Sequence, residues 1–148
     1  MSDINILEQH REHWYKLQKL RENIEELRER VTQPRRSLLR HGGSSRRETD
    51  NIGDMLSVIE QTENKYYDLY NQYICERQKI ENILDNVPEI RERIILRYRY
   101  YNGGMQWKEI IKKFGISRST AQGIQQEALK HFEEAAAEQS HIEEAQST

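Results

Sequence analysis

The side chains best suited to chemistry in this chain are hydroxyl, amide and guanidinium groups between residues 117 and 126. They lie on one face of a predicted helix that is short of acids: Ser117, Arg118, Ser119, Gln122, Gln125 and Gln126. Amide and guanidinium groups form hydrogen bonds with the edges of nucleic-acid bases. The pattern favours base contacts over simple solvation, with Arg118 as the first candidate for a guanine or phosphate contact and the others after it.

Two short helices joined by a tight turn are needed to position this face. One apolar face at helical spacing comes before the turn and another follows it: Trp107, Ile110, Ile111 and Phe114, then Ala121, Ile124 and Leu129. Gly115 lies where such a turn needs a positive φ, and Ser117 is placed to cap the second helix. The pattern predicts a helix-turn-helix, and an ordinary pair of packed helices with a glycine turn is the alternative.

Basic residues flank the predicted helix-turn-helix on both supporting helices. Lys108, Lys112 and Lys113 lie on its first helix, and we expect them to meet backbone phosphates. Arg97 and Arg99 end a preceding helix and are further phosphate candidates, although a solvated helix face explains them almost as well.

The preceding helix is predicted over residues 88–102. Pro88 suits the first position of a helix, and Gly103 with Gly104 allows a left-handed turn at its end. The residues expected to face inward are Ile90, Ile94, Ile95 and Tyr98.

Two longer helical patterns occupy the first part of the chain, over residues 2–31 and from Asp50 or Asn51 to Val87. Their inward positions step by three and four: Ile6, His10, His13, Leu17, Leu20, Ile24, Leu27 and Val31, then Ile52, Met55, Ile59, Thr62, Tyr66, Leu69, Tyr73, Glu76, Ile80, Ile83 and Val87. Such stripes predict an antiparallel coiled-coil hairpin that self-associates as a dimer or higher oligomer. We interpret His10 and His13 as polar seam residues, not as metal ligands.

The loop between the two stripes, residues 32–50, contains Pro34, a Gly-Gly pair and several arginines. Its basic residues are Arg35, Arg36, Arg40, Arg46 and Arg47. Two interpretations stay open, an arm that contacts nucleic-acid phosphates and a solvated connector. A nucleotide-binding loop is disfavoured because the Lys-Ser/Thr ending of a P-loop is missing.

Composition predicts an all-α protein with a modest core, since hydrophobic residues make up 35% and charged residues 32% of the chain. The net charge of −2 hides an uneven distribution. Residues 87–132 hold nine Lys and Arg against four Asp and Glu, whereas residues 133–148 hold five Glu and no basic residue. We expect a hairpin stalk over residues 1–86, a DNA-binding domain over 87–132 and an acidic tail over 133–148.

A cytosolic, non-enzymatic protein is expected from what the chain lacks. One cysteine cannot form an internal disulfide, and no apolar run is long enough to cross a membrane. No nucleophile is paired with a base, and no cluster of ligands predicts a metal or another cofactor.

Residues 87–132 resemble region 4 of bacterial sigma factors. The matching motifs are Pro88, Leu96-Arg97-Tyr98, Gly103-Gly104, Glu109-Ile110, Gly115-Ile116-Ser117, Ala128-Leu129 and Phe132. The whole arrangement is similar to small sigma-region-4-like proteins of phages of Gram-positive bacteria, of the type that activates late genes for packaging and lysis. Ser119 and Gly123 depart from the sigma pattern, where an acidic residue and a Gln are usual. The resemblance therefore implies the scaffold but a different base-reading face.

This resemblance implies a transcriptional regulator that binds double-stranded DNA in the cytoplasm of a bacterial host and has RNA polymerase as a second partner. Two other functions stay open. One is a coiled-coil adaptor that binds RNA polymerase without touching DNA, and the other is a small terminase subunit.

Overall fold

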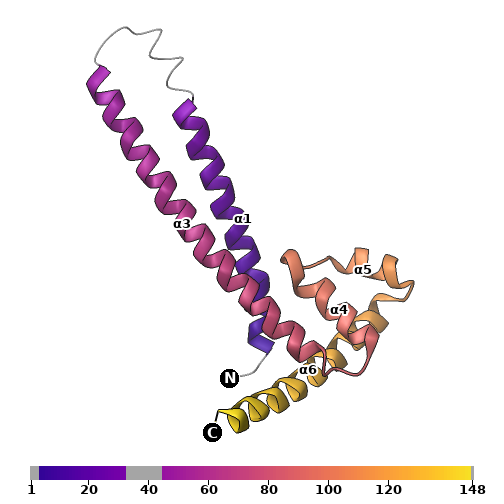
Figure 1. Cartoon of the computed structure of the whole chain (residues 1–148). Helices are drawn as coiled ribbons and strands as arrows, with labels where there is room; N and C mark the ends of the chain where they lie inside the picture. The colour runs from indigo at the N-terminus through magenta and orange to yellow at the C-terminus, as the bar shows by residue number, and fades with distance from the viewer. Residues whose placement is uncertain (1–3, 33–44, 148) are drawn as a thin grey trace. The chain divides into compact units, whose positions relative to one another are not determined.

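The computed structural model describes residues 4–32 and 45–147, and every regular element in these ranges is helical. The elements are α1 (Ile4–Thr32), α3 (Ser45–Leu84), α4 (Ile90–Tyr100), the 3₁₀ turn η1 (Tyr101–Gly103), α5 (Trp107–Phe114) and α6 (Arg118–Gln146) (Figure 1). The predicted all-α class is confirmed. No helix in the described ranges combines the length and apolar character needed to cross a bilayer.

The chain divides into two compact units. The first unit comprises residues 1–15 and 73–148, and the second comprises residues 16–72. The sequence predicted a boundary near residue 86, but the structure groups the ends of both long helices with the following helices. The reason is packing, because Leu7 of α1 and Ile80 and Leu84 of α3 are buried in the same core as α4 to α6.

The core of the first unit is built by five helices, and Phe132 is its largest fully buried side chain. Its fully buried members come from α1, α3, α4, α5 and α6, as follows: Leu7, Ile80, Leu84, Ile95, Leu96, Ile110, Ala121, Ala128 and Phe132. Figure 1 shows α4 and α5 against the first half of α6. This core holds the first turns of α6 at the surface, where they are accessible to a partner.

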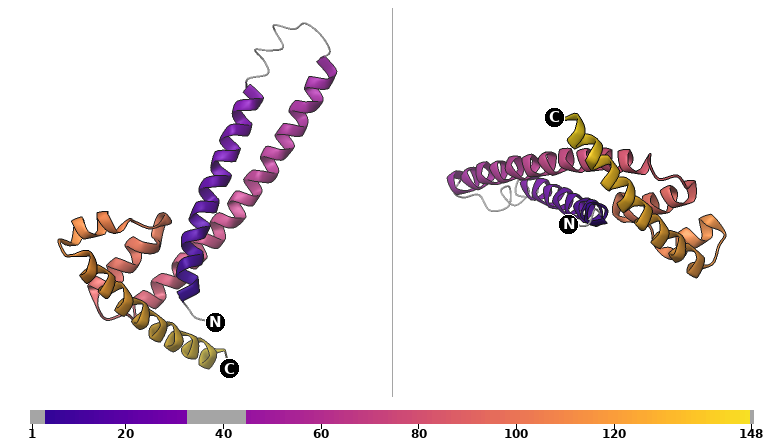
Figure 2. Two further views of the ribbon diagram at one scale, coloured as in Figure 1. Left: turned by 180° about the vertical axis from the view of Figure 1, so that it is seen from behind. Right: turned by 90° about the horizontal axis from the view of Figure 1, so that it is seen from below.

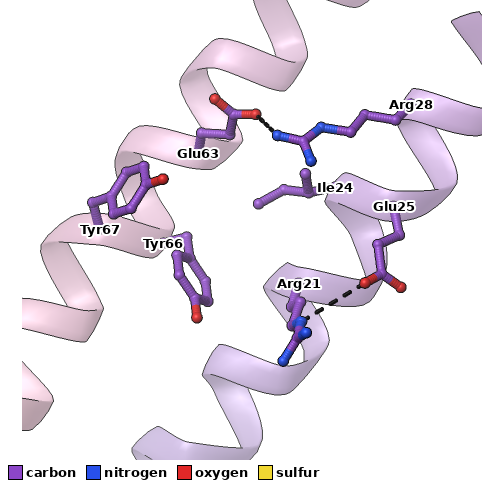
Figure 3. A pocket seen from close by; sticks show the side chains of 7 residues that line it. All are labelled: Arg21, Ile24, Glu25, Arg28, Glu63, Tyr66 and Tyr67. Carbon is purple, nitrogen blue, oxygen red and sulfur yellow. Dashed lines mark hydrogen bonds and ion pairs between the residues drawn. The ribbon is translucent and has the colours of Figure 1, made fainter.

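The second unit contains residues 16–32 of α1 and 45–72 of α3, which lie side by side with opposite chain directions (Figure 2). Leu17, Ile24 and Ile59 are buried there, as the stripes predicted. An ion pair joins Arg28 of α1 to Glu63 of α3, and Arg21 reaches Glu25 one turn along α1 at 3.7 Å. Figure 3 shows these side chains around a shallow hollow with Tyr66 and Tyr67.

Two helix starts differ from the prediction. α3 begins at Ser45, ahead of Asp50, because no Gly or Pro interrupts residues 45–51. α4 begins at Ile90, with Glu89 as its N-cap in extended backbone, so Pro88 lies outside the helix. Ile90, expected to be inward, is 65% exposed because it opens the first turn. Ile95 is buried as predicted, Leu96 is buried as well, and Ile94 and Tyr98 are half-buried.

The predicted acidic tail is not separated from the helix before it. α6 runs without a break from Arg118 to Gln146, and Ala135 and Ala136 pack into the core of the first unit. Three consecutive alanines favour the helix over residues 135–137, so it continues past Phe132.

Candidate nucleic-acid interface

The connection between α5 and α6 has the backbone that the sequence predicted. Gly115 ends α5 in the left-handed conformation at φ 66° and ψ 31°, and its N–H donates to the Ile111 carbonyl at 2.9 Å. An added Cβ at Gly115 would meet no atom within 4 Å, so the positive φ alone favours glycine here. Ser117 caps α6, and its Oγ accepts from the Thr120 N–H at 3.2 Å. Both local predictions are confirmed.

The predicted base-contacting residues lie together on the first turns of α6. Arg118, Ser119, Gln122 and Gln126 are exposed on this helix. Gln125 differs, because it is half-buried and its side-chain amide donates to the Tyr100 hydroxyl at 3.3 Å. The exposed groups form one polar face at helical spacing, and we call Arg118, Ser119, Gln122 and Gln126 the α6 face.

The three lysines of α5 add positive charge on the helix before the Gly115 turn, and Lys108 lines one hollow together with Arg118. Lys108, Lys112 and Lys113 are all exposed. The Lys113 ammonium lies 5.3 Å from the centre of the Tyr98 ring. Within the described ranges, none of the three is in an ion pair with a carboxylate. These side chains are therefore free to approach an anionic partner.

Arg97, a predicted phosphate contact, is engaged inside the first unit. Its guanidinium donates twice to the Glu81 carboxylate, from Nε at 3.0 Å and from Nη2 at 2.8 Å. The Tyr101 hydroxyl donates to the same carboxylate. The Arg97 contact lowers the pKa of Glu81 and raises that of Arg97. This geometry favours a structural role, in which Arg97 ties α4 to α3.

Arg99 has a different environment two residues later. Its Nη1 donates to the Met105 carbonyl at 3.0 Å, and its guanidinium carbon lies 4.5 Å from the centre of the Trp107 ring. Its Nε is buried without a hydrogen-bond partner. Burial lowers the pKa of Arg99, and the nearby charges of Arg11 and Arg118 lower it further. Arg99 thus lies among cations, close to the start of α6.

The structure describes only part of the basic loop that was predicted to contact phosphates. Arg35, Arg36 and Arg40 lie outside the described residues. Arg46 and Arg47 belong to the first turn of α3, but their side chains also lie outside the described part of the chain. Their predicted contact with phosphates stays a prediction.

A second polar cluster in the first unit was only partly foreseen. The sequence placed His10, His13 and Glu76 on the inward stripes, and all three are buried. His13 Nδ1 lies 2.8 Å and His10 Nδ1 lies 3.3 Å from the same Glu76 oxygen, and the His10 ring stacks on Tyr73 at 4.0 Å. Arg77 Nε donates to His10 Nε2 at 3.1 Å. We call these five residues the closed cluster.

The closed cluster has the geometry of a satisfied polar core. Burial lowers the pKa of His10, which keeps its ring neutral and able to accept from Arg77. No group of three His, Cys, Asp or Glu side chains in the described ranges is placed to hold a metal ion. The polar atoms satisfy one another and leave little for an external ligand.

Sequence reasoning missed one cation near the α6 face. Arg11 of α1 has its guanidinium carbon 5.2 Å from the centre of the Tyr100 ring and lowers the pKa of Arg99. Arg11 directly follows the seam residue His10 in the sequence, and a basic residue next to a seam position is ordinarily solvated. No local signal could have placed it near α4, because the approach depends on how α1 packs in the first unit.

Comparison with known families matches the chain over residues 30–133 to a family described as protein of unknown function (DUF1492). The match covers more than half of the chain, which therefore belongs to this family. Searches of curated proteins and of solved structures gave no match.

Proposed function

We propose that this member of the DUF1492 family is a sequence-specific regulator of transcription that binds double-stranded DNA and has no catalytic activity. The proposal takes α5, the Gly115 turn and α6 as a helix-turn-helix, with α6 in the major groove. The long helices would form the coiled-coil hairpin on which this headpiece is built. The protein would act in a bacterial cytoplasm, as an activator of phage late genes.

The α6 face is the observation that carries this proposal. Its four side chains are exposed at the start of a capped helix, and none of them forms a hydrogen bond or an ion pair with another residue of the described ranges. Arg118 is suited to guanine or to a backbone phosphate, and the amides of Gln122 and Gln126 are suited to adenine. A face intended only for solvation would carry more acids, and the first turn of α6 has none.

The lysines of α5 supply the part of the affinity that does not depend on sequence. Lys108, Lys112 and Lys113 lie on the helix that supports α6, where a helix-turn-helix crosses the DNA backbone. Each phosphate contact releases counterions, so affinity falls as salt rises. Replacing one of these lysines would weaken binding to all sequences alike.

Selection of bound duplexes from a random double-stranded library tests the proposal. We expect an enriched motif, bound at least about a thousandfold more tightly than unrelated DNA at physiological salt. Gln122→Ala should alter the preferred base at one position of the motif. Lys112→Ala should weaken selected and unrelated duplexes equally. Failure to enrich any motif, even at low salt, would overturn the proposal.

Self-association belongs to the same proposal, because DNA-binding proteins of this size commonly act as dimers on paired half-sites. Leu56, Tyr67 and Tyr70 share one face of α3 in the second unit and are 52%, 59% and 43% exposed. A second copy could cover this stripe in a four-helix arrangement. Sedimentation equilibrium at tens of micromolar should give a dimer or larger species, and Tyr67→Lys should shift it to monomer.

The alternatives differ in what these assays would show. An adaptor for RNA polymerase would bind the enzyme through the headpiece and enrich no DNA motif. A small terminase subunit would form a ring and bind packaging sites. A dimer with a motif upstream of promoters favours the regulator.

A further inference from the structure

A hollow lies on the first unit between the end of α4 and the starts of α5 and α6. Five residues line it: Arg99, Gln106, Trp107, Lys108 and Arg118. Three of them are cations, and none is a carboxylate. Its volume is about 310 Å³, which is room for several water molecules or for one phosphate group with its hydration.

Arg99 is held in place at this hollow before any ligand arrives. The Met105 carbonyl fixes one side of its guanidinium, and the Trp107 ring lies against it at 4.5 Å. Its Nε hydrogen is buried and has no partner. A fixed guanidinium with unused donors loses little side-chain freedom when it binds an oxyanion.

The charges around the hollow are not compensated. Arg118 and Lys108 line it, and Arg11 is close enough to affect Arg99. None of these four basic side chains is in an ion pair with an acid in the described ranges. Like charges near a partly buried cation raise the free energy of the folded protein, and an anion in the hollow would offset that cost.

The neighbouring Arg97 shows that this fold does pair arginines where pairing serves stability. Glu81 binds Arg97 through two oxygens, whereas Arg99 has the Met105 carbonyl as its acceptor. Both residues belong to the last turn of α4. Of the four arginines of α4, Arg97 is the only one in an ion pair within the described ranges, and Arg99 differs from it in having a carbonyl as its acceptor instead of a carboxylate.

We propose that this hollow binds one phosphate group of the DNA backbone, with Arg99 and Arg118 as its main donors. Lys108 and the Gln106 amide are secondary donors, and Arg11 adds attraction from α1. The inference rests on the proposed function, which it deepens by naming the residues that fix the register of α6 on the duplex. Phosphate contacts of this kind position a protein without reading sequence.

Trp107 provides a direct probe, because the guanidinium that binds the anion lies on its ring. A Trp14→Phe background leaves Trp107 as the single tryptophan. Inorganic phosphate, titrated against sodium chloride of equal ionic strength, should change the Trp107 emission in a saturable way. Arg99→Gln and Arg118→Gln should abolish the change. Arg91→Gln, at an exposed arginine of the same helix, should retain it.

The folding of each variant is checked by its helical circular dichroism. Arg118 is exposed, so Arg118→Gln tests the hollow even where Arg99→Gln perturbs α4. A phosphate response that is absent in the background protein, or that is unchanged in both variants, would overturn the proposal.

Measurements of duplex binding distinguish an error in the proposed phosphate site from an error in the proposed function. On an unrelated duplex, Arg99→Gln should raise Kd roughly tenfold and reduce the salt slope by about one phosphate contact, with the selected motif unchanged. If Arg99→Gln kept the wild-type affinity and salt slope, the hollow would not be a phosphate site, whereas the proposal that the protein binds DNA would still hold. If phosphate changed the Trp107 emission but no duplex bound, the DNA-binding proposal would be wrong and the hollow would be a site for another anion.

Discussion

Two polar clusters in the first unit use similar side chains in opposite ways. In the closed cluster, the buried side chains of His10 and His13 share one oxygen of the buried Glu76, and the half-buried Arg77 donates to His10. Around the hollow, Arg99 and Arg118 lie beside other cations with no acid to pair with. The closed cluster has its partners within the protein, whereas the cations around the hollow have no acidic partner among the described residues, which is why we propose the hollow as a phosphate site. We infer that pairing with an acid, more than the number of basic residues nearby, separates an arginine with a structural role from one that is available to a ligand.

The largest expected effect is on the closed cluster. Glu76→Ala removes the shared acceptor of two buried histidines, so we expect the free energy of unfolding to fall by about 2 to 4 kcal/mol. Urea denaturation followed by circular dichroism measures it. Glu63→Ala is the matched control, because it breaks the more exposed pair with Arg28 and should cost at most about 1 kcal/mol. Equal losses in the two variants would show that the closed cluster has no special role in stability.

The next effect is on binding and falls on the α6 face. Arg118→Ala should weaken binding to the selected motif by about 1 to 3 kcal/mol and leave the helical content unchanged, because the side chain is exposed. Fluorescence anisotropy with a labelled duplex measures the change. Arg91→Ala is the control for the loss of one positive charge. Equal affinity of Arg118→Ala and wild type for the best site would contradict the assignment.

A smaller pair of effects compares Arg97 with Arg99 directly. Arg97→Gln should lower the free energy of unfolding by about 0.5 to 1 kcal/mol, since its pair with Glu81 is partly exposed, and should leave DNA affinity within about twofold. Arg99→Gln should reverse the pattern, with weaker DNA binding and a smaller loss of stability, because the relief of repulsion among like charges offsets the lost hydrogen bond to the Met105 carbonyl. Thermal unfolding and anisotropy on the same samples measure both. Loss of DNA binding in Arg97→Gln alone would reverse the roles we give the two residues.

The sequence predicted features that depend on local backbone and spacing. The positive φ at Gly115, the Ser117 cap and the inward positions of His10 and Glu76 all follow from residue type and helical period. The sequence could not predict that Arg97 pairs with a carboxylate and that Arg99 does not. Glu81 is a partner for one of them only because of how α3 and α4 pack. Arg11 likewise joins the cations through tertiary packing, which no periodicity in α1 describes.

The sequence favoured a helical extension past Phe132, but the packing of this extension into the core was missed for a related reason. Glutamates after Phe132 suggested a solvated end, but the alanines between them pack into the core. A count of charge along the chain does not distinguish the two faces of a helix. The helical period would have separated Ala135 and Ala136 from the exposed Glu134 and Glu138.

The smallest effect concerns pH and lies on α6 itself. His131 Nδ1 is 2.7 Å from a Glu92 oxygen, and this hydrogen bond raises the pKa of His131 above its ordinary value of 6.5, with Glu127 and Glu134 adding to the rise. A raised folded-state pKa means that the pair stabilises the fold fully below about pH 6.5 and loses that contribution as pH rises through the folded-state pKa.

His10 acts in the opposite direction, because burial lowers its pKa, so its protonation opposes folding as pH falls below 6.5. Because both wild type and His131→Gln contain His10, its contribution cancels when the stabilities of the two proteins are compared. We expect the stability difference between the two proteins to be larger at pH 6 than at pH 8.5, measured by thermal unfolding at matched ionic strength. Glu92→Gln should bring the pKa of His131, followed by NMR, back toward 6.5. A stability difference that is the same at both pH values would show that the ion pair does not form, and α6 would then be held against α4 by apolar contacts and by the Gln125–Tyr100 hydrogen bond.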